Sequence, residues 1–511
     1  MKKKFLLLLT SLLTLVSCDI RIGDIIFSGL NNDSQTSSSS YEPESISISI
    51  EEGNNYYLAS NLKYSFRDTN GQYGWYTSYS TGEQKVLVVP VDLADYSNTS
   101  KGWNVSKLQD LNTAFFGNSE DTTFESVKNY FYKSSYGKLN LTGEVTSVFT
   151  SKYTYNQINN YGESGGDYVA DEFYKSADAS LLKQYDLDND GYVDNCIFIY
   201  SNNYDYDSSF WAWCTYKWPV ENPNHNKPAV NNYMWASYHF MEDSYSDYYN
   251  YGKVETHTYI HEMGHMLGLD DYYCYDENYS WDPAGKLDMQ SYNVGDHNAY
   301  SKMALGWIDP FVVTGSCEIN LKTSAKYPQA ILINDNWNGS SFDEYLLIEY
   351  YTPSMLNQVD ALHDLSGDSK MYNYNGLRIY HIDARIVKTT ADSQGSLNPS
   401  SNYVDVIGNE NEYYYLVGAS NSYTYSNLPS STSMKYRYVH LLDQAGNNRL
   451  NGGYGGNIST SSALWTGSKV FTPSSVFFAN GTKFNDNSTI GYSIAVSDLT
   501  DEECKVTITK L

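Results

Sequence analysis

Basic residues are scarce in this chain of 511 residues. Lysine and arginine together number 33 against 60 aspartates and glutamates, which gives a formal net charge of -27 at pH 7. A protein of that charge repels the phosphates of DNA and RNA, so nucleic acid is excluded as a partner. The balance fits an acidic protein that works outside the cytoplasm.

Cysteines are also few, and their spacing excludes one class of metal site. Six are present, and no two have the C-x-x-C spacing of a thiolate metal site. Cys18 belongs to an N-terminal signal, which leaves an odd number in an oxidising compartment, so at least one is free or paired between chains. We interpret the remaining five as structural or incidental: Cys196, Cys214, Cys274, Cys317 and Cys504.

The N-terminal apolar segment is too short to cross a bilayer. Three lysines precede an apolar stretch from Phe5 to Val16, as in an export signal. Residues 15–18, Leu-Val-Ser-Cys, resemble the bacterial lipobox, whose cysteine receives a diacylglyceryl group. We therefore predict a lipoprotein signal peptide over residues 1–18, with Cys18 as a lipid anchor on the extracellular face of the cytoplasmic membrane. The alternative is an ordinary cleaved signal, which releases the protein to the medium.

Residues 19–81 are predicted to be a serine-rich tether and an N-terminal segment. From Asn31 to about Gly53 the sequence has few apolar side chains and cannot offset its ordering entropy. Ordered structure is expected from about Lys85. The sequence leaves open whether a propeptide between Cys18 and about Gly82 is removed.

Strand and helix patterns alternate up to about residue 310. Residues 85–93 and 196–200 predict buried strands, with Pro90 near an edge or bulge. Residues 122–137 predict a helix capped by Thr122 and Glu125. Short β runs after Trp307 predict an all-β sandwich domain over residues 311–511. The fold class is thus α+β, with a first domain over residues 82–310.

The segment HEMGHMLGLDD, residues 261–271, has the pattern of a zinc site. His261 and His265 are four residues apart, which places both imidazoles on one helix face. Glu262 stands beside the first and can take a proton from a zinc-activated water without ligating the metal. A glycine at residue 268 can end the helix in a left-handed conformation, so that Asp271 becomes the third ligand. The alternative is a core helix with two satisfied histidines.

Other residues compete for the third position. His257 lies one turn before His261, but about 12 Å of helical rise separates it from His265, too far for one ion. We therefore expect His257 to pack or to support the site. Asp270, Asp276 and Glu277 remain competitors, and the spacing from Gly268 favours Asp271.

The extended motif resembles the metzincin zinc peptidases, and the surrounding segments resemble the immune inhibitor A family of secreted bacterial metallopeptidases. These segments are GEQKVLVVPVDLADYS, SVKNYFYKSSYGKLNLTGEV, DLDNDGYVDNCIFIY, KLDMQSYN and AYSKMALGWID, within about residues 82–385. The resemblance implies a zincin-like catalytic domain with a mixed sheet and an active-site helix. It also implies that Met289 is the Met-turn methionine, with core packing as the alternative. Tyr292 is a candidate oxyanion stabiliser, but it stands three residues after Met289 rather than two, and packing is the alternative role.

A second acidic pattern has the spacing of a calcium loop. Positions 1, 3, 5, 7 and 9 are filled by oxygen donors, and Gly191 at position 6 permits a sharp turn. Ile197 occupies position 12 in place of the glutamate of an EF-hand, so an EF-hand is excluded. A structural calcium site, which the family resemblance also implies, is predicted against the alternative of a solvated acidic turn. Its ligands would be Asp186, Asp188, Asp190, the carbonyl of Tyr192, and Asp194.

These patterns predict a surface-anchored zinc endopeptidase that hydrolyses extracellular proteins or peptides, with Glu262 as general base, and that acts as a monomer. The competing class is a cell-surface adhesin or glycan-binding lipoprotein with a vestigial peptidase domain. A non-proteolytic zinc hydrolase is a third possibility. The intact set His261, Glu262, His265 and Asp271 favours the peptidase, because a vestigial site usually loses its base or a ligand. Cleavage specificity and the role of residues 311–511 are left open.

Overall fold

The computed structural model describes residues 41–44, 53–60, 62–63, 78–205, 208–217, 219–242, 253–273, 283–285, 288–291, 294–362, 372–389, 403–404, 413–416, 437–444, 463–474 and 482–511. The predicted signal peptide with Cys18, most of the predicted tether and N-terminal segment over residues 19–81, and Tyr292 lie outside these residues. No helix within the described ranges is long and apolar enough to span a membrane.

A mixed sheet organises the first half of the chain. Its strand order is β3-β2-β5-β7-β6, and β4 also pairs with β2. All neighbours are parallel except β6, which runs antiparallel to β7 at the edge. The strands are β2 (Gly82–Asp92), β3 (Leu139–Val145), β4 (Phe149–Thr150), β5 (Cys196–Tyr200), β6 (Trp213–Tyr216) and β7 (Asn232–Ser237). The predicted strands over residues 85–93 and 196–200 are confirmed as β2 and β5.

Pro90 lies in the central strand β2, at the point where the strand that pairs with one edge of β2 changes from β3 to β4. On that side β2 pairs with β3 as far as Val88 and with β4 from Val91. A proline has no amide hydrogen to donate, so the gap between β3 and β4 accommodates it.

Helices cover both faces of this sheet, which explains its continuous apolar strands. Alternate β2 side chains pack in two separate clusters: Leu87 and Val89 with helices α5 to α7, and Val86 and Val88 with α3, α4 and α9. These helices are α3 (Val105–Phe116), α4 (Val127–Ser134), α5 (Tyr155–Asn160), α6 (Gly165–Ser176), α7 (Ala179–Leu182) and α9 (His257–Met266). Short 3-10 turns are η2 (Ser119–Asp121), η3 (Gly162–Ser164), η4 (Lys183–Tyr185) and η5 (Tyr238–Met241).

The predicted helix start at Thr122 is wrong. Helix α4 begins at Val127, and the Ser126 hydroxyl caps it by accepting from the amide of Asn129 at 3.3 Å. The Glu125 carboxylate binds Lys133 and the Ser119 hydroxyl instead of a helix-terminal amide. A serine one residue before the apolar pattern of the helix is the better placed cap.

The described part of the second half is mostly β, with two short helical segments, η6 (Met355–Asn357) and α11 (Gln358–Leu362). One sheet has the order β1-β8-β10-β11-β12-β16 and a second the order β17-β18-β9. A third small sheet contains β13 (Ile386–Thr389), β14 (Tyr403–Val404) and β15 (Tyr413–Leu416). The strands of the two larger sheets are β1 (Tyr56–Leu58), β8 (Phe311–Val313), β9 (Cys317–Lys322), β10 (Ile331–Ile333), β11 (Glu344–Tyr351), β12 (Gly376–Asp383), β16 (Val439–Leu441), β17 (Tyr492–Ser497) and β18 (Glu503–Lys510).

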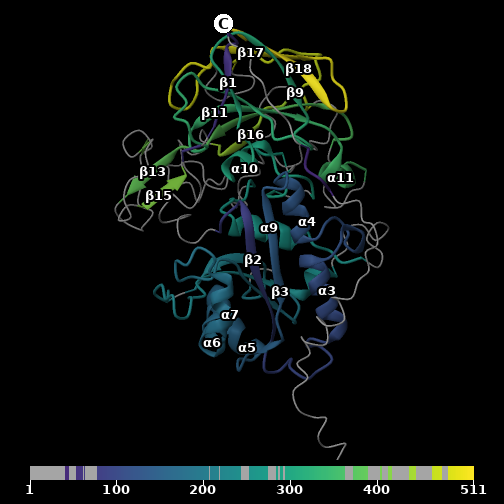
Figure 1. The fold of residues 1–511 in the computed structure, drawn as a ribbon, viewed down its shortest axis with the longest axis vertical. Helices are drawn as coiled ribbons and strands as arrows, with labels where there is room; N and C mark the ends of the chain where they lie inside the picture. Colours follow the sequence, from purple (N-terminus) through teal and green to yellow (C-terminus); the bar gives the residue numbers. More distant parts are fainter. Residues whose placement is uncertain are drawn as a thin grey trace, which may run out of the picture.

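The two halves share structure across the predicted boundary at residue 310. Strand β1 comes from the N-terminal segment, yet it pairs antiparallel with β8. One continuous hydrophobic cluster contains Phe131 and Met289 together with Tyr345 and Tyr380. Figure 1 shows α10 (Ala299–Ala304) between the sheet with β2 and β3 and the sheets of the second half. The described chain is therefore α+β, with several separate sheets and few helices.

Candidate metal centre

Helix α9 carries the two histidines of the motif. It spans His257–Met266 and buries one side against the first sheet through Ile260 and Met263. The helix ends at Leu267, and Gly268 has a φ of +104°, the left-handed conformation expected at this glycine. The chain therefore turns back toward the helix face that carries the imidazoles.

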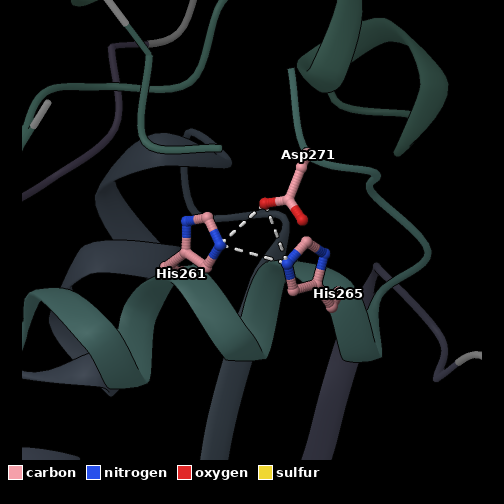
Figure 2. A group of neighbouring side chains, drawn as sticks. All are labelled: His261, His265 and Asp271. Atoms are coloured by element: carbon pink, nitrogen blue, oxygen red, sulfur yellow. Dashed lines mark hydrogen bonds and ion pairs between the residues drawn. The ribbon is translucent and has the colours of Figure 1, made fainter. Parts of the chain in front are cut away.

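Three side-chain atoms meet at that face. The Nε2 atoms of His261 and His265 lie 3.1 Å apart, and Asp271 Oδ1 lies 2.9 Å from the first and 3.3 Å from the second. Figure 2 shows both rings and the carboxylate pointing at one another, with the two rings rising from consecutive turns of the helix. The side chains are only 13%, 18% and 8% exposed, respectively. The structure thus brings together the three residues predicted as zinc ligands.

The second nitrogen of each imidazole fixes its tautomer. His261 Nδ1 lies 2.8 Å from the carbonyl of Met289, and His265 Nδ1 lies 2.6 Å from the carbonyl of Leu269. A carbonyl only accepts, so both Nδ1 atoms carry a hydrogen. In neutral rings both Nε2 atoms then present lone pairs to each other and to the Asp271 carboxylate. Three acceptors at hydrogen-bond distance repel one another unless a cation lies between them.

The spacing of the three atoms fits a zinc ion. Around a tetrahedral zinc with ligands at about 2.0–2.1 Å, neighbouring ligand atoms lie about 3.3–3.4 Å apart. The observed separations of 2.9, 3.1 and 3.3 Å are close to that edge length. Two imidazoles and one carboxylate are also a donor set that zinc accepts, and three protein ligands leave a fourth position open.

Without a metal ion, protons on the imidazole Nε2 atoms take the place of that cation. Burial on its own raises the pKa of Asp271, but the charge of His265 and hydrogen bonds from both imidazoles outweigh burial and hold that pKa well below its usual range. Burial lowers the pKa of His265, and the Asp271 charge outweighs it, raising the pKa to about 10. The carboxylate thus stays ionised beside the two rings.

Glu262 lies beside the three ligand atoms, but its carboxylate does not belong to the converging group. It is 6% exposed, and its Oε2 has no hydrogen-bond partner among the residues that the structure describes. Burial raises the pKa of its carboxyl group, against the opposing charges of His265 and His261. The neighbouring edge strand β6 approaches here, since the Cys214 thiol donates to the backbone carbonyl of Glu262 at 2.9 Å. A buried carboxylate oxygen with no partner is costly unless it serves a ligand or a reaction.

Two competitors for the third ligand position, His257 and Asp270, lie outside the group of converging atoms. The His257 ring lies 6.4 Å from the His261 ring, and the group of converging ligand atoms includes neither His257 nor Asp270. Burial and the charge of His261 lower the pKa of His257 to about 3, so it remains neutral. Asp276 and Glu277 lie outside the described residues, as does the predicted oxyanion stabiliser Tyr292.

The turn over residues 288–291 contacts helix α9 through Met289 and Gln290. Met289 is fully buried, and its backbone carbonyl orients His261. Asp288 holds the turn by accepting from the Gln290 amide at 2.8 Å and from the Asn298 amide at 2.8 Å. Burial raises the pKa of Asp288 to about 7, against the opposing effect of these hydrogen bonds.

Gln290 links this turn to α9, a role that sequence reasoning missed. Its Nε2 donates to the His261 carbonyl at 3.2 Å, and its Oε1 lies 3.2 Å from His297 Nε2. The side chain fits because residue 264 is glycine: a Cβ there would lie 2.2 Å from Gln290 Oε1. A glycine inside a predicted helix was the available signal, since it marks a close approach.

The predicted calcium loop brings three of its five ligands together. The carboxylates of Asp186, Asp188 and Asp190 each place an oxygen within 4.8 Å of the others. Asp186 Oδ1 is buried and has no hydrogen-bond partner among the described residues, and burial raises the pKa of Asp186. Asp194 is outside this group, and its Oδ2 accepts from the Leu187 amide at 2.8 Å, which closes the loop.

The loop backbone has the turn that such a site needs. Gly191 has a φ of +90°, and a Cβ there would lie 2.6 Å from the amide of Asn224. Its carbonyl accepts from the amides of Asn224 and Ala229. Tyr192 forms an isolated parallel bridge with Ala229, so its backbone is held beside the loop. Whether its carbonyl binds an ion stays a prediction.

The four described cysteines are free thiols. Cys196, Cys214, Cys317 and Cys504 form no disulfide, and Cys18 and Cys274 lie outside the described residues.

Neither a known protein-family model nor any of the curated proteins matches this chain.

Proposed function

We propose that this chain is a zinc-dependent endopeptidase. The observation that carries the proposal is the convergence of His261 Nε2, His265 Nε2 and Asp271 Oδ1 beside the buried, unpartnered carboxylate oxygen of Glu262. His261, His265 and Asp271 would hold the zinc. The ion supplies Lewis acidity at an open fourth position, which activates water and polarises a carbonyl.

Glu262 performs the proton transfers in this proposal. Its free Oε2 takes a proton from the attacking water and returns it to the nitrogen of the departing amine. Burial raises its carboxyl pKa, which suits a group that must hold this proton between the two steps. The Nδ1 hydrogen bonds to the carbonyls of Met289 and Leu269 hold each histidine ring in the orientation that points its Nε2 at the proposed metal position.

Edge strand β6 offers a place for an extended substrate. Within the described residues it pairs with β7 alone, through Trp213 to Tyr216. The other edge of this strand, from Trp213 to Thr215, can therefore pair with a peptide in strand conformation. The contact between Cys214 and the Glu262 carbonyl sets this edge next to the base. Protein or peptide substrates are thus favoured over small esters or amides.

Substitution of the base tests the proposal most directly. The Glu262→Gln variant keeps the size of the side chain and should retain one zinc per chain while losing at least about 1,000-fold in casein cleavage. Glu163→Gln, on the 3-10 turn η3, is the matched control and should behave as wild type. Wild-type protein without chelatable zinc, or Glu262→Gln with normal proteolysis, would refute the assignment.

The resemblance to the immune inhibitor A family and to metzincins extends this proposal. In that interpretation the first half is a zincin-like catalytic domain and Met289 is the Met-turn methionine beneath the metal. The second half would be a sandwich domain, supported by the hydrophobic cluster that joins Ile331 and Ile348 of one sheet to Ile494 and Val506 of the other. An intact base and ligand set favour this enzyme over an adhesin with a vestigial peptidase domain.

We also propose a structural calcium ion in the loop that begins at Asp186. Three carboxylates within 4.8 Å of one another repel unless a cation balances them, and the buried Asp186 Oδ1 lacks a protein partner among the described residues. The loop leads into β5 at Cys196, so the ion would stabilise a central strand of the first sheet.

The cellular setting remains a proposal from the N-terminal sequence. Cys18 would anchor a monomeric enzyme to the outer face of the cytoplasmic membrane, or an ordinary signal cleavage would release it to the medium. Labelling with a radioactive fatty acid should mark wild type but not Cys18→Ala.

A further inference from the structure

The residue after the proposed metal ligand Asp271 is held by the second half of the chain. Tyr272 is fully buried, and its amide donates to the Gln290 carbonyl at 2.7 Å. Its hydroxyl lies 2.6 Å from the Ser301 hydroxyl on α10. Its ring meets the ring of Tyr438 edge-on, with centroids 5.7 Å apart. Tyr272 is therefore fixed from several sides, and one of these contacts comes from more than 160 residues downstream.

Tyr438 is itself rigidly placed. It is fully buried beside β16, and its backbone carbonyl accepts from the amide of Asp383 in β12 at 3.0 Å. Its hydroxyl lies 2.9 Å from the hydroxyl of Tyr300, and the two rings pack edge-on at 5.1 Å. The neighbouring amide of Leu441 donates to the Pro283 carbonyl at 2.8 Å. The sheet of the second half thus contacts the segment between the ligand and the supporting turn at two points.

Asp271 has little freedom once its neighbours are fixed. On one side Leu269 accepts from His265 and donates to the Gly264 carbonyl, and on the other Tyr272 is held by Gln290, Ser301 and Tyr438. A shift of the Tyr272 ring would move the Asp271 carboxylate away from the imidazoles. Metal affinity depends steeply on such support.

We propose that the second half of the chain is part of the metal centre and that Tyr438 is a positioning residue for Asp271. The inference rests on the proposed zinc site, but it concerns how the protein builds that site. It assigns a role to residues beyond 310 that does not require them to touch substrate.

Zinc affinity in the full-length protein tests the inference. Affinity is measured by competition with a chromophoric chelator for wild type, Tyr438→Ala and Tyr438→Phe. Removal of the ring in Tyr438→Ala should weaken zinc binding about 10- to 100-fold, by analogy with the loss of outer-shell support at other zinc sites. Tyr438→Phe keeps the ring and loses the hydroxyl that contacts Tyr300, so its affinity should change about threefold or less.

The matched control is Tyr492→Ala. Tyr492 is equally buried, but it lies in β17 and its hydroxyl bonds Asp335, in a hydrophobic cluster that excludes the metal-site residues. This variant should lose thermal stability and keep the zinc affinity of wild type. Equal losses of affinity in Tyr438→Ala and Tyr492→Ala would overturn the proposal, as would wild-type affinity in Tyr438→Ala.

Three further outcomes are distinguishable. If Tyr438→Ala does not fold, Tyr438→Leu replaces it, since leucine retains most of the apolar bulk without the ring. Unchanged zinc affinity in that variant overturns the inference, and a loss of about tenfold supports it. If wild type itself binds no zinc, the proposed metal site fails and this inference fails with it. If wild type binds zinc but cleaves no protein, only the proposed peptidase activity fails.

Discussion

The substitution Gly264→Ala should push the turn over residues 288–291 away from helix α9. The added Cβ would lie 2.2 Å from Gln290 Oε1 and 2.8 Å from Gln290 Cδ, whereas an unstrained carbon–oxygen contact needs about 3.3 Å. The glutamine must therefore withdraw by about 1 Å. That movement breaks its hydrogen bonds to the His261 carbonyl and to His297, both 3.2 Å long.

The free-energy terms of this substitution have opposite signs. Replacing glycine by alanine inside a helix stabilises by about 1 kcal/mol. Two lost hydrogen bonds in a buried site cost about 1 kcal/mol each, and overpacking adds about 1–3 kcal/mol. We therefore expect Gly264→Ala to lower the free energy of unfolding by about 2–4 kcal/mol.

A double-mutant cycle checks the reasoning. Urea unfolding, followed by tryptophan fluorescence, gives the free energy of unfolding for wild type, Gly264→Ala, Gln290→Ala and the double variant. In the Gln290→Ala background the clash is absent, so Gly264→Ala should be neutral or stabilising by up to about 1 kcal/mol. If Gly264→Ala destabilises equally in both backgrounds, Gln290 does not fill the space left by this glycine.

Three further predictions concern the metals and acid stability. Asp271→Ala should lose bound zinc, measured by atomic absorption, while Asp270→Ala keeps it; zinc retained by Asp271→Ala but lost by Glu277→Ala would transfer the third ligand to Glu277. A calcium-selective chelator should lower the melting temperature of wild type before it removes zinc and should have little effect on Asp186→Asn; identical melting of wild type with and without the chelator would mean that the loop binds no ion. Burial lowers the pKa of His440 to about 3, below the value of about 6.5 in the unfolded chain, so its contribution to stability is complete above pH 6.5 and is lost as the pH falls toward 3. Between pH 7 and pH 5 wild type should lose about 2 kcal/mol that His440→Asn does not lose, and parallel pH profiles in urea unfolding would contradict this.

The convergence of His261, His265 and Asp271 was predictable because local geometry determines it. Two histidines four residues apart on a helix must share a face, and a glycine three residues later can reverse the chain. The positive φ of Gly268 and the approach of Asp271 follow from this local pattern. The buried strands β2 and β5 were predictable for the same reason, since their apolar runs need both faces covered.

The support of the site was not predictable, because its contacts are distant in sequence. Gln290 meets the helix through a hydrogen bond across 29 residues, and Tyr438 meets Tyr272 across a far longer separation. No spacing rule connects such residues. The error at Thr122 is different: two capping residues stood four positions apart, and burial of the apolar face of α4 selected Ser126.

The contacts between the two halves hold the segment that carries Asp271. Asp271 lies on a connecting segment, and such segments are usually the more mobile parts of a fold. Here Leu269 is held by His265 and Gly264 on one side of Asp271, and Tyr272 is held by Gln290 and Tyr438 on the other. A zinc ion bound by this segment would therefore stabilise the native state of both halves, because the folded form of each is the surface on which the other packs. The extended β structure beyond residue 310 then has a physical role at a site to which it contributes none of the converging ligand atoms.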